Sequence, residues 1–326
     1  MGMLITGIYI QIRRNVMSKD FAARRKKDEE INALIEKEIE AFTEEFSNIP
    51  VIAGWSEGGQ SRNETIYVRP PYFMNLLPFK EGNGPQPRPK TIERYKEAEE
   101  NRNHAPQPVK DLLSQVPSKV LKGKSTPDDI RELLQKAVRS DLIRSENGLS
   151  HPNSEDIRNW LKKYGIGVDC SGFASQVLNR VTQRAYEASS MSPPHQLSID
   201  NTSSADLKGG EGRKQSFIRV RTPSDLRPAD TMQIESKGKS EHVRIIEKVT
   251  TTPEGYIEFT TVESSGRANG INEATWRYKN KDSFTGLQTM KKEASKQINP
   301  WEDERGDKEI TYGHYRDVED YKTTQE

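Results

Sequence analysis

The chain has 326 residues, of which 32% are hydrophobic and 30% charged, and its 50 Lys and Arg residues nearly balance 49 Asp and Glu residues. The resulting net charge of +1 offers no field that would recruit nucleic acid or an anionic membrane. A single cysteine excludes an internal disulfide framework and a zinc site built from several cysteines. No stretch reaches the roughly 18 apolar residues of a membrane span. We expect one large domain or two modest ones, with no metal or organic cofactor and with neither nucleic acid nor membrane as a partner.

The first residues do not follow the order of a secretory leader. Met3–Ile10 is apolar but short, and Arg13 and Arg14 follow it, whereas basic residues come first in a leader. Met17 resembles a natural start, so residues 1–16 are either an upstream extension or an added strand. We expect the protein to be made in the cytoplasm without a signal peptide and to reach any outside target by a route other than general secretion.

The first 125 residues combine one clear helix with a long irregular stretch. Residues 27–46 have the apolar spacing of an amphipathic helix, which predicts packing against the rest of the protein more than binding to a membrane surface. Residues 48–90 are rich in proline and predict a loop or an extended arm, whose aromatic residues indicate that it packs on the protein. We treat residues 1–125 as a helical and proline-rich region of unknown role.

Three further helices are predicted before the chain changes pattern. Thr126 precedes Pro127 and two acidic residues, which predicts a helix start, and Gly148 ends the segment. Ser154 is the expected cap of a second, short helix that Gly165 stops. A third helix carries an apolar stripe formed by Phe173, Ala174, Val177, Leu178 and Val181.

The last third of the chain predicts a sheet. Residues 188–216 are polar and rich in Ser, Gly and Pro, which indicates a long surface loop. Strands are predicted at Phe217–Val220, Thr231–Ile234, Val243–Val249, Tyr256–Val262, Thr275–Tyr278 and near Ile310–Tyr315. Helices followed by a run of strands favour an α+β fold over alternating α/β. A boundary near residue 125 would leave residues 126–326 as the second domain.

The single cysteine, Cys170, lies at the start of an apolar run in VDCSGFASQVL. Asp169 is a favourable N-cap, so Cys170 falls in the first turn of a helix, where the dipole and free N–H groups favour a thiolate. Those N–H groups can also bind the oxyanion of an attacked carbonyl, and Gly172 leaves room for a substrate backbone. The alternative is a structural cysteine on an apolar face, but the Asp-Cys-Ser-Gly setting favours a nucleophile.

A thiolate needs a base, and His242 is the histidine best placed to provide it. It opens the predicted strand HVRIIEKV, where a side chain can project into a cleft while its neighbours anchor the other face. The remaining histidines lie in polar, proline-flanked or terminal stretches: His104, His151, His195 and His314.

The base in turn needs an acceptor that orients it, and strand pairing suggests Glu263. With a four-residue loop at Thr251–Glu254, His242 stands directly opposite Glu263, close enough for a hydrogen bond. A slip of one residue would bring Val262 or Ser264 to this place instead. The alternative for Glu263 is an exposed strand carboxylate.

Three separated stretches resemble NlpC-type cell-wall cysteine peptidases of the papain-like superfamily. They are DCSGF at Asp169–Phe173, a Pro-x-Asp turn at Pro228–Asp230, and HVRIIEKV at 242–249 with the following VES at Val262–Ser264. The last two are most similar to CHAP amidase/peptidase domains. The resemblance covers residues 154–280 and implies a papain-like domain in which a nucleophile helix packs on a small antiparallel sheet.

The resemblance implies Cys170 as nucleophile, His242 as general base and Glu263 as the residue that orients it. Asp169, Ser171, Gly172 and Tyr164 would form the substrate and oxyanion neighbourhood. Tyr164 either takes the family's tyrosine role near the oxyanion or simply ends the preceding helix. The approach to the cysteine is compressed to YGIGVDC, and the 188–216 loop is longer than the family norm.

The implied activity is a cysteine peptidase or amidase that cleaves a stem-peptide bond of peptidoglycan or the amide joining peptide to glycan. One alternative is a papain-like toxin or effector that acts on a protein by proteolysis or deamidation. Another is a non-catalytic component of a phage or secretion particle. The partners expected are peptidoglycan or a peptide, with a delivery apparatus or an immunity protein.

Overall fold

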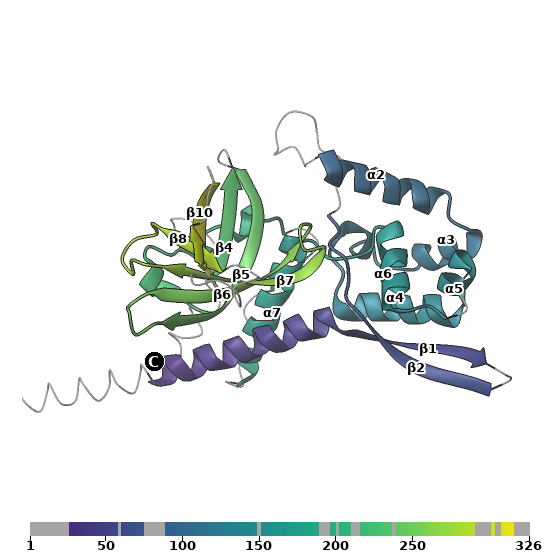
Figure 1. Cartoon of the computed structure of the whole chain (residues 1–326), viewed down its shortest axis with the longest axis horizontal. Helices are drawn as coiled ribbons and strands as arrows, with labels where there is room; N and C mark the ends of the chain where they lie inside the picture. The colour runs from purple at the N-terminus through teal and green to yellow at the C-terminus, as the bar shows by residue number, and fades with distance from the viewer. Residues whose placement is uncertain are drawn as a thin grey trace, which may run out of the picture.

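The computed structural model describes residues 26–57, 60–74, 89–148, 151–188, 196–199, 202–209, 216–236, 239–290, 301–303 and 308–315. The predictions made for residues 1–16 and for His195 lie outside this range. Among the described residues, helices and antiparallel sheets occur together, as an α+β fold requires. A helical group and a large sheet lie next to each other, with a long helix at residues 26–47, here called the N-terminal helix, running beneath them (Figure 1).

The helical group precedes the sheet in the chain, and its last helix, α7, packs directly on β5 and β6 of the sheet. The described loops contain short 3-10 turns: η1 (Val120–Lys122), η2 (Ala205–Leu207) and η3 (Pro223–Asp225). The helices are α2 (Pro89–Asn103), α3 (Gln107–Ser114), α4 (Pro127–Arg139), α5 (Leu142–Asn147), α6 (Ser154–Lys163) and α7 (Cys170–Ala188).

The large sheet has strand order β3-β10-β4-β5-β6-β7-β8-β9, with every neighbouring pair antiparallel. All six predicted strands are present. The strands are β3 (Phe217–Arg219), β4 (Thr231–Ser236), β5 (Lys239–Thr251), β6 (Ile257–Ser265), β7 (Gly270–Tyr278), β8 (Leu287–Met290), β9 (Trp301–Asp303) and β10 (Lys308–Tyr315). One face of β5 and β6 packs on α7, and the other face covers a second apolar cluster around Phe259, Trp276 and Tyr312.

The stretch predicted as a loop or arm at 48–90 contains a β-hairpin instead. Strand β1 (Ile49–Glu57) pairs antiparallel with β2 (Gln60–Val68), and β1 lies against α4. The sequence signal was the Gly-Gly dipeptide at 58–59, which is typical of a two-residue hairpin loop. The later prolines masked this signal because they dominate the composition of the whole stretch.

The helix boundaries follow the capping residues closely. Thr126 caps α4 as predicted, because its hydroxyl accepts from the Asp129 N–H at 3.1 Å while the Asp129 carboxylate accepts from the Thr126 N–H at 2.8 Å. The segment does not continue to Gly148 as one helix, since α4 ends at Arg139 and α5 follows. The cap of α6 is Asn153, one residue before the predicted Ser154.

The N-terminal helix packs on α7, which confirms the prediction of a packing helix. The Phe42 and Phe46 rings lie 6.5 and 5.6 Å from the ring of Phe173 in α7. In the helical group, α2 packs against α6 and α3 against α4. One apolar cluster includes residues on both sides of the boundary expected near residue 125.

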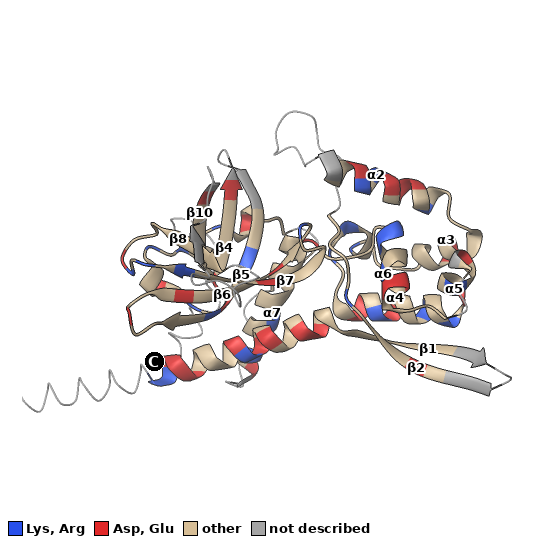
Figure 2. Ribbon diagram, viewed as in Figure 1, with Lys and Arg blue, Asp and Glu red and all other residues tan. Residues whose placement is uncertain are grey.

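Charges of both signs are mixed along the N-terminal helix and α4 (Figure 2). This pattern agrees with the balanced composition, which gives no strong field. Among the helices that the structure describes, none is both long and apolar enough to cross a membrane.

The backbone around Gly123 is packed so closely that it leaves no room for a side chain. Gly123 has φ +72°, and a Cβ there would overlap the carbonyl oxygen of Phe73. Gly148 has a similar φ of +63° but nothing within 4 Å of its Cβ position. We expect Gly123→Ala to lower the free energy of unfolding by about 3 kcal/mol or more, and Gly148→Ala by about 1 kcal/mol. Urea denaturation of both variants checks this, and equal losses would show that the Phe73 contact is unimportant.

Candidate active site

Cys170 is the first residue of α7, and the helix begins there because Asp169 caps it. The Asp169 carboxylate accepts a hydrogen bond from the Gly172 N–H at 2.6 Å, and its carbonyl accepts the first helical bond from Phe173 at 3.0 Å. This is the N-cap geometry that the sequence predicted. Cys170 is 5% exposed, so its thiol lies at the rim of the core, at the helix end where the dipole favours an anion.

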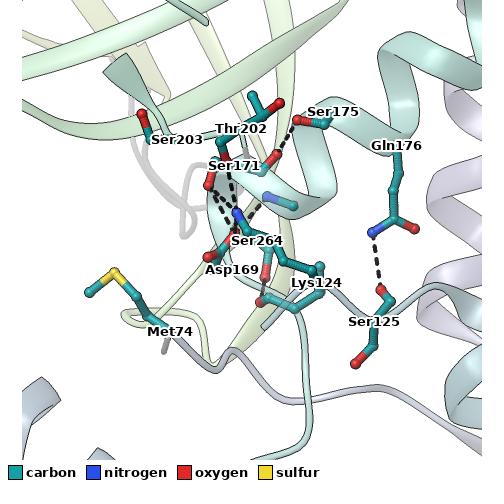
Figure 3. Close-up of polar contacts among 12 residues, drawn as sticks. Met74, Lys124, Ser125, Asp169, Ser171, Ser175, Gln176, Thr202, Ser203 and Ser264 are labelled. Carbon is teal, nitrogen blue, oxygen red and sulfur yellow. Dashed lines mark hydrogen bonds and ion pairs between the residues drawn. The ribbon is translucent and has the colours of Figure 1, made fainter. Parts of the chain in front are cut away.

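The segment that leads into Cys170 is fixed by three parts of the chain. Val168 forms a parallel bridge with Tyr72, in the stretch after the hairpin, and an antiparallel bridge with Lys124. Its carbonyl accepts a hydrogen bond from the Ser264 hydroxyl of β6 at 2.7 Å (Figure 3). These contacts set the position of Cys170 relative to the sheet.

Gly172 does not leave room for a substrate backbone, as the sequence had suggested. A Cβ at this position would lie 2.8 Å from the Gly123 carbonyl oxygen and 2.9 Å from Cδ of Lys124. The space beside Gly172 is therefore filled by the protein itself. Since the Gly172 N–H also donates to Asp169, it is not a donor for an oxyanion.

His242 connects the cysteine to the sheet. Its ring is hydrogen-bonded to the Cys170 side chain, and its Nε2 contacts the Glu263 carboxylate. Glu263 is 3% exposed and is held on its other oxygen by Asn272 Nδ2 at 3.1 Å. Arg244 Nε lies 3.0 Å from the same Glu263 oxygen that His242 contacts. The structure thus brings Cys170, His242 and Glu263 into one chain of contacts.

The strand register that produces this arrangement differs from the predicted one. The hairpin loop is longer than expected, with Thr251 opposite Ile257, so His242 does not stand directly opposite Glu263. A bulge at Glu247 then shifts the register by one residue, and Ile245 pairs with Val262. One step further along, Arg244 and Glu263 form their ion pair, which makes His242 a diagonal neighbour of Glu263 on the same face.

The bulge decides which β5 side chains share the face of Glu263. Without the extra residue, the register of Lys248 opposite Thr260 would continue and pair Glu263 with Ile245 instead of Arg244, so that Ile245 rather than His242 and Arg244 would share its face. With the bulge, Glu263 shares the face of His242, and Ser264 points to Val168 instead. Glu263 therefore lies on the same face as His242, as predicted, but the β5–β6 register that places it there differs from the predicted one.

The electrostatics of the site favour a protonated imidazole. Burial lowers the pKa of His242, but the charge and hydrogen bond of Cys170, and then those of Glu263, outweigh it and raise the pKa to about 9. Burial tends to raise the pKa of Glu263, whereas His242, Arg244 and Asn272 together lower it below its usual range. At neutral pH a protonated His242 therefore lies between the Cys170 side chain and the ionised Glu263 carboxylate.

This pKa can be measured directly. Because the His242 pKa is raised, the imidazolium should persist through neutral pH and lose its proton only near pH 9. In Cys170→Ala the largest favourable interaction is gone, and we expect the His242 pKa to fall by at least one unit. An NMR titration of the five histidines tests both values. A His242 pKa near 6.5 in both proteins would contradict the interactions of the imidazole with Cys170 and Glu263.

The other sequence candidates occupy different places. Tyr164 ends α6, and its hydroxyl contacts Glu146. Burial raises the pKa of Tyr164 above its ordinary value, and the contact with Glu146 raises it further. It therefore matches the alternative in which it only closes the preceding helix. His314 Nδ1 lies 2.5 Å from Asp230 Oδ1, in a separate pair on β10 and the Pro-x-Asp turn. His104 bonds the Glu100 carbonyl of its own helix at 3.0 Å.

Sequence reasoning missed three residues that support the site: Lys124, Arg244 and Asn272. Period-2 alternation could have pointed to Arg244, which follows His242 by two residues on the same face. Asn272 stands directly opposite Glu263 in the β6–β7 pair. Nothing in the local sequence distinguishes Lys124, because its partners come from positions 169, 171 and 202.

Within the described residues, no group of His, Cys, Asp and Glu side chains has the geometry of a metal site. In comparisons with known proteins, the chain matches no family model, no curated protein and no solved structure. The chemistry of the site must therefore be argued from its own residues.

Proposed function

We propose that the protein is a cysteine hydrolase that cleaves an amide bond through an acyl-thioester on Cys170. The observation that carries this proposal is the chain of contacts from Cys170 through His242 to Glu263 at the start of a helix. A structural cysteine needs neither an imidazole partner nor a carboxylate behind that imidazole. The three residue types stand in the order that nucleophile, base and orienting group require.

The reaction begins with the thiolate of Cys170 and the imidazolium of His242. The thiolate attacks the amide carbonyl and forms a C–S bond, and the oxyanion is held by first-turn N–H groups of α7 other than that of Gly172. As the intermediate collapses, the C–N bond breaks and His242 donates its proton to the leaving amine. Water then attacks the thioester while neutral His242 takes its proton, and C–S cleavage restores the ion pair.

Glu263 acts on His242 rather than on substrate. Its carboxylate holds the ring by one nitrogen and stabilises the imidazolium, while Asn272 and Arg244 hold the carboxylate in place. No metal or organic cofactor is needed for any of these steps.

We propose that the substrate is peptidoglycan. This proposal is based on three stretches that resemble NlpC-type and CHAP domains: DCSGF, the Pro-x-Asp turn and HVRIIEKV. The test is mass spectrometry of the soluble products released from purified sacculi by the wild-type protein. New stem-peptide ends would identify an endopeptidase, and free glycan chains with intact stems would identify an amidase. If sacculi are left intact while a peptide library is cleaved, peptidoglycan is excluded as the substrate, whereas the proposed cysteine hydrolase activity is supported.

A protein substrate is the second candidate. The insertion between α7 and β3 favours it, because its described residues at 196–199 and 202–209 are fixed to the rest of the protein. Side chains of α7 and β4 hold this insertion, including Asn179 on the Leu197 backbone and Gln233 on the Ser204 carbonyl. An insertion fixed in this way can contact a substrate and select a particular peptide. Expression in bacteria with and without a grafted signal peptide separates the two: Cys170-dependent lysis only after export indicates the cell wall, and toxicity without export indicates a cytoplasmic protein.

A further inference from the structure

A buried lysine lies directly beneath the start of the nucleophile helix. The side chain of Lys124 is 8% exposed, and its ammonium donates to Asp169 Oδ1 at 2.9 Å, Ser171 Oγ at 2.6 Å and the Thr202 carbonyl at 3.0 Å (Figure 3). Three partners satisfy all three donors of the ammonium. The partners flank Cys170 on both sides in the sequence and include the insertion that follows α7.

The position of this ammonium is fixed from both sides. The backbone of Lys124 bridges Val168, two residues before Cys170, and the carbonyl of the adjacent Ser125 accepts from Gln176 of α7 at 3.0 Å. Because the backbone on either side is attached to the nucleophile segment, the charge has little freedom to move away. A buried ammonium is strongly destabilising unless it is paired, so Lys124 depends on its partner Asp169.

The ion pair of Lys124 with Asp169 offsets an unfavourable effect of the Asp169 charge on Cys170. A carboxylate next to Cys170 in sequence disfavours a second negative charge, the thiolate, at the same helix end. Asn or Ser would cap the helix equally well without that charge. With Lys124 in contact, the carboxylate keeps its hydrogen bond to the Gly172 N–H while its charge is balanced locally.

We propose that Lys124 is a positioning residue for the reaction: it neutralises the Asp169 cap and fixes the first turn of α7, together with the insertion at Thr202, so that the Cys170 thiolate forms at neutral pH. This inference rests on the proposed function, because it concerns the reactivity of the same nucleophile. The effect of the Lys124–Asp169 pair on the Cys170 thiolate depends on the sum of the two charges, so each charge can be removed separately to test it.

The test is the pH dependence of iodoacetamide alkylation, followed by intact mass, since the chain has one cysteine. Lys124→Met leaves the Asp169 charge unbalanced, and we expect its profile to move up by about one pH unit, with alkylation about tenfold slower at pH 6.5. Asp169→Asn keeps the cap and should react at least as fast as the wild type. The double variant K124M/D169N should return to within about threefold of the wild-type rate.

Lys208→Met is the matched control, because Lys208 also holds the insertion through a buried carboxylate, Glu235, at 2.6 Å. It should leave the alkylation profile unchanged. A double variant no faster than K124M would show a purely structural role and overturn the inference. If K124M does not fold, an upward shift in Asp169→Asn alone would overturn it. A wild-type profile like that of an ordinary thiol would instead overturn the proposed function itself.

Discussion

Replacing Cys170 by alanine is expected to abolish release of soluble fragments from sacculi, with a loss of at least about a thousandfold. The thiol forms the covalent bond of the reaction, and no other cysteine exists to replace it. The protein should remain folded, because the change removes one sulfur atom from a residue at the rim of the core. Fragment release is measured by mass spectrometry, and folding by circular dichroism. Activity within tenfold of the wild type would exclude Cys170 as the nucleophile.

His242→Ala should cause a loss of similar size, since the variant has no group to protonate the leaving amine. The chain offers a matched control in His314→Ala, which removes another partly buried histidine that contacts a carboxylate, Asp230. We expect His314→Ala to keep most of the activity even if it lowers the melting temperature. Equal losses in the two variants would indicate that both act through stability rather than through catalysis.

Glu263→Gln is expected to reduce turnover by about 10- to 100-fold, less than either change above. The amide can still contact the imidazole, but it removes the charge that helps to raise the His242 pKa. That pKa should therefore fall, and the alkaline limb of activity should move from about pH 9 to lower pH. Arg244 also loses its charged partner, so the free energy of unfolding should fall by about 1–2 kcal/mol. The pH–rate profile and urea denaturation measure the two effects.

Glu235→Gln is the control for Glu263→Gln. Glu235 is as deeply buried, at 1% exposed, and pairs with a cation, Lys208, on the neighbouring part of the sheet. It should lose a comparable amount of stability and keep the position of the alkaline limb. If Glu263→Gln leaves the profile unchanged while Ser264→Ala is inactive, the orienting role belongs to the Ser264–Val168 contact instead.

The parts of the site that local sequence determines could be predicted. Asp169 and Cys170 lie at a helix start because an N-cap and an apolar stripe are visible within a few residues of each other. The same holds for Thr126 and α4, and for the six strands with strong alternation. The cap of α6 was misplaced by one residue because Asn153 and Ser154 are both good caps, and only the Asp156 partner distinguishes them.

The parts that depend on pairing between distant residues could not be predicted. The bulge at Glu247 carries no glycine or other local mark, yet it decides whether His242 and Arg244 or Ile245 share the face of Glu263. Lys124 looks like a surface residue in the sequence, and only the folded chain brings it to Asp169 and Thr202. The contact of the N-terminal helix with α7 likewise joins residues more than a hundred positions apart.

The most direct test of the account is the pH at which Cys170 becomes reactive, and how far His242 controls it. We predict that iodoacetamide alkylates the wild-type protein readily near pH 6, whereas His242→Ala reacts only as the pH approaches the value of about 8.5 typical of a free thiol. Intact mass gives both profiles without knowledge of the substrate. Identical profiles in the two proteins, each with a midpoint near pH 8.5, would contradict a thiolate–imidazolium pair at this site.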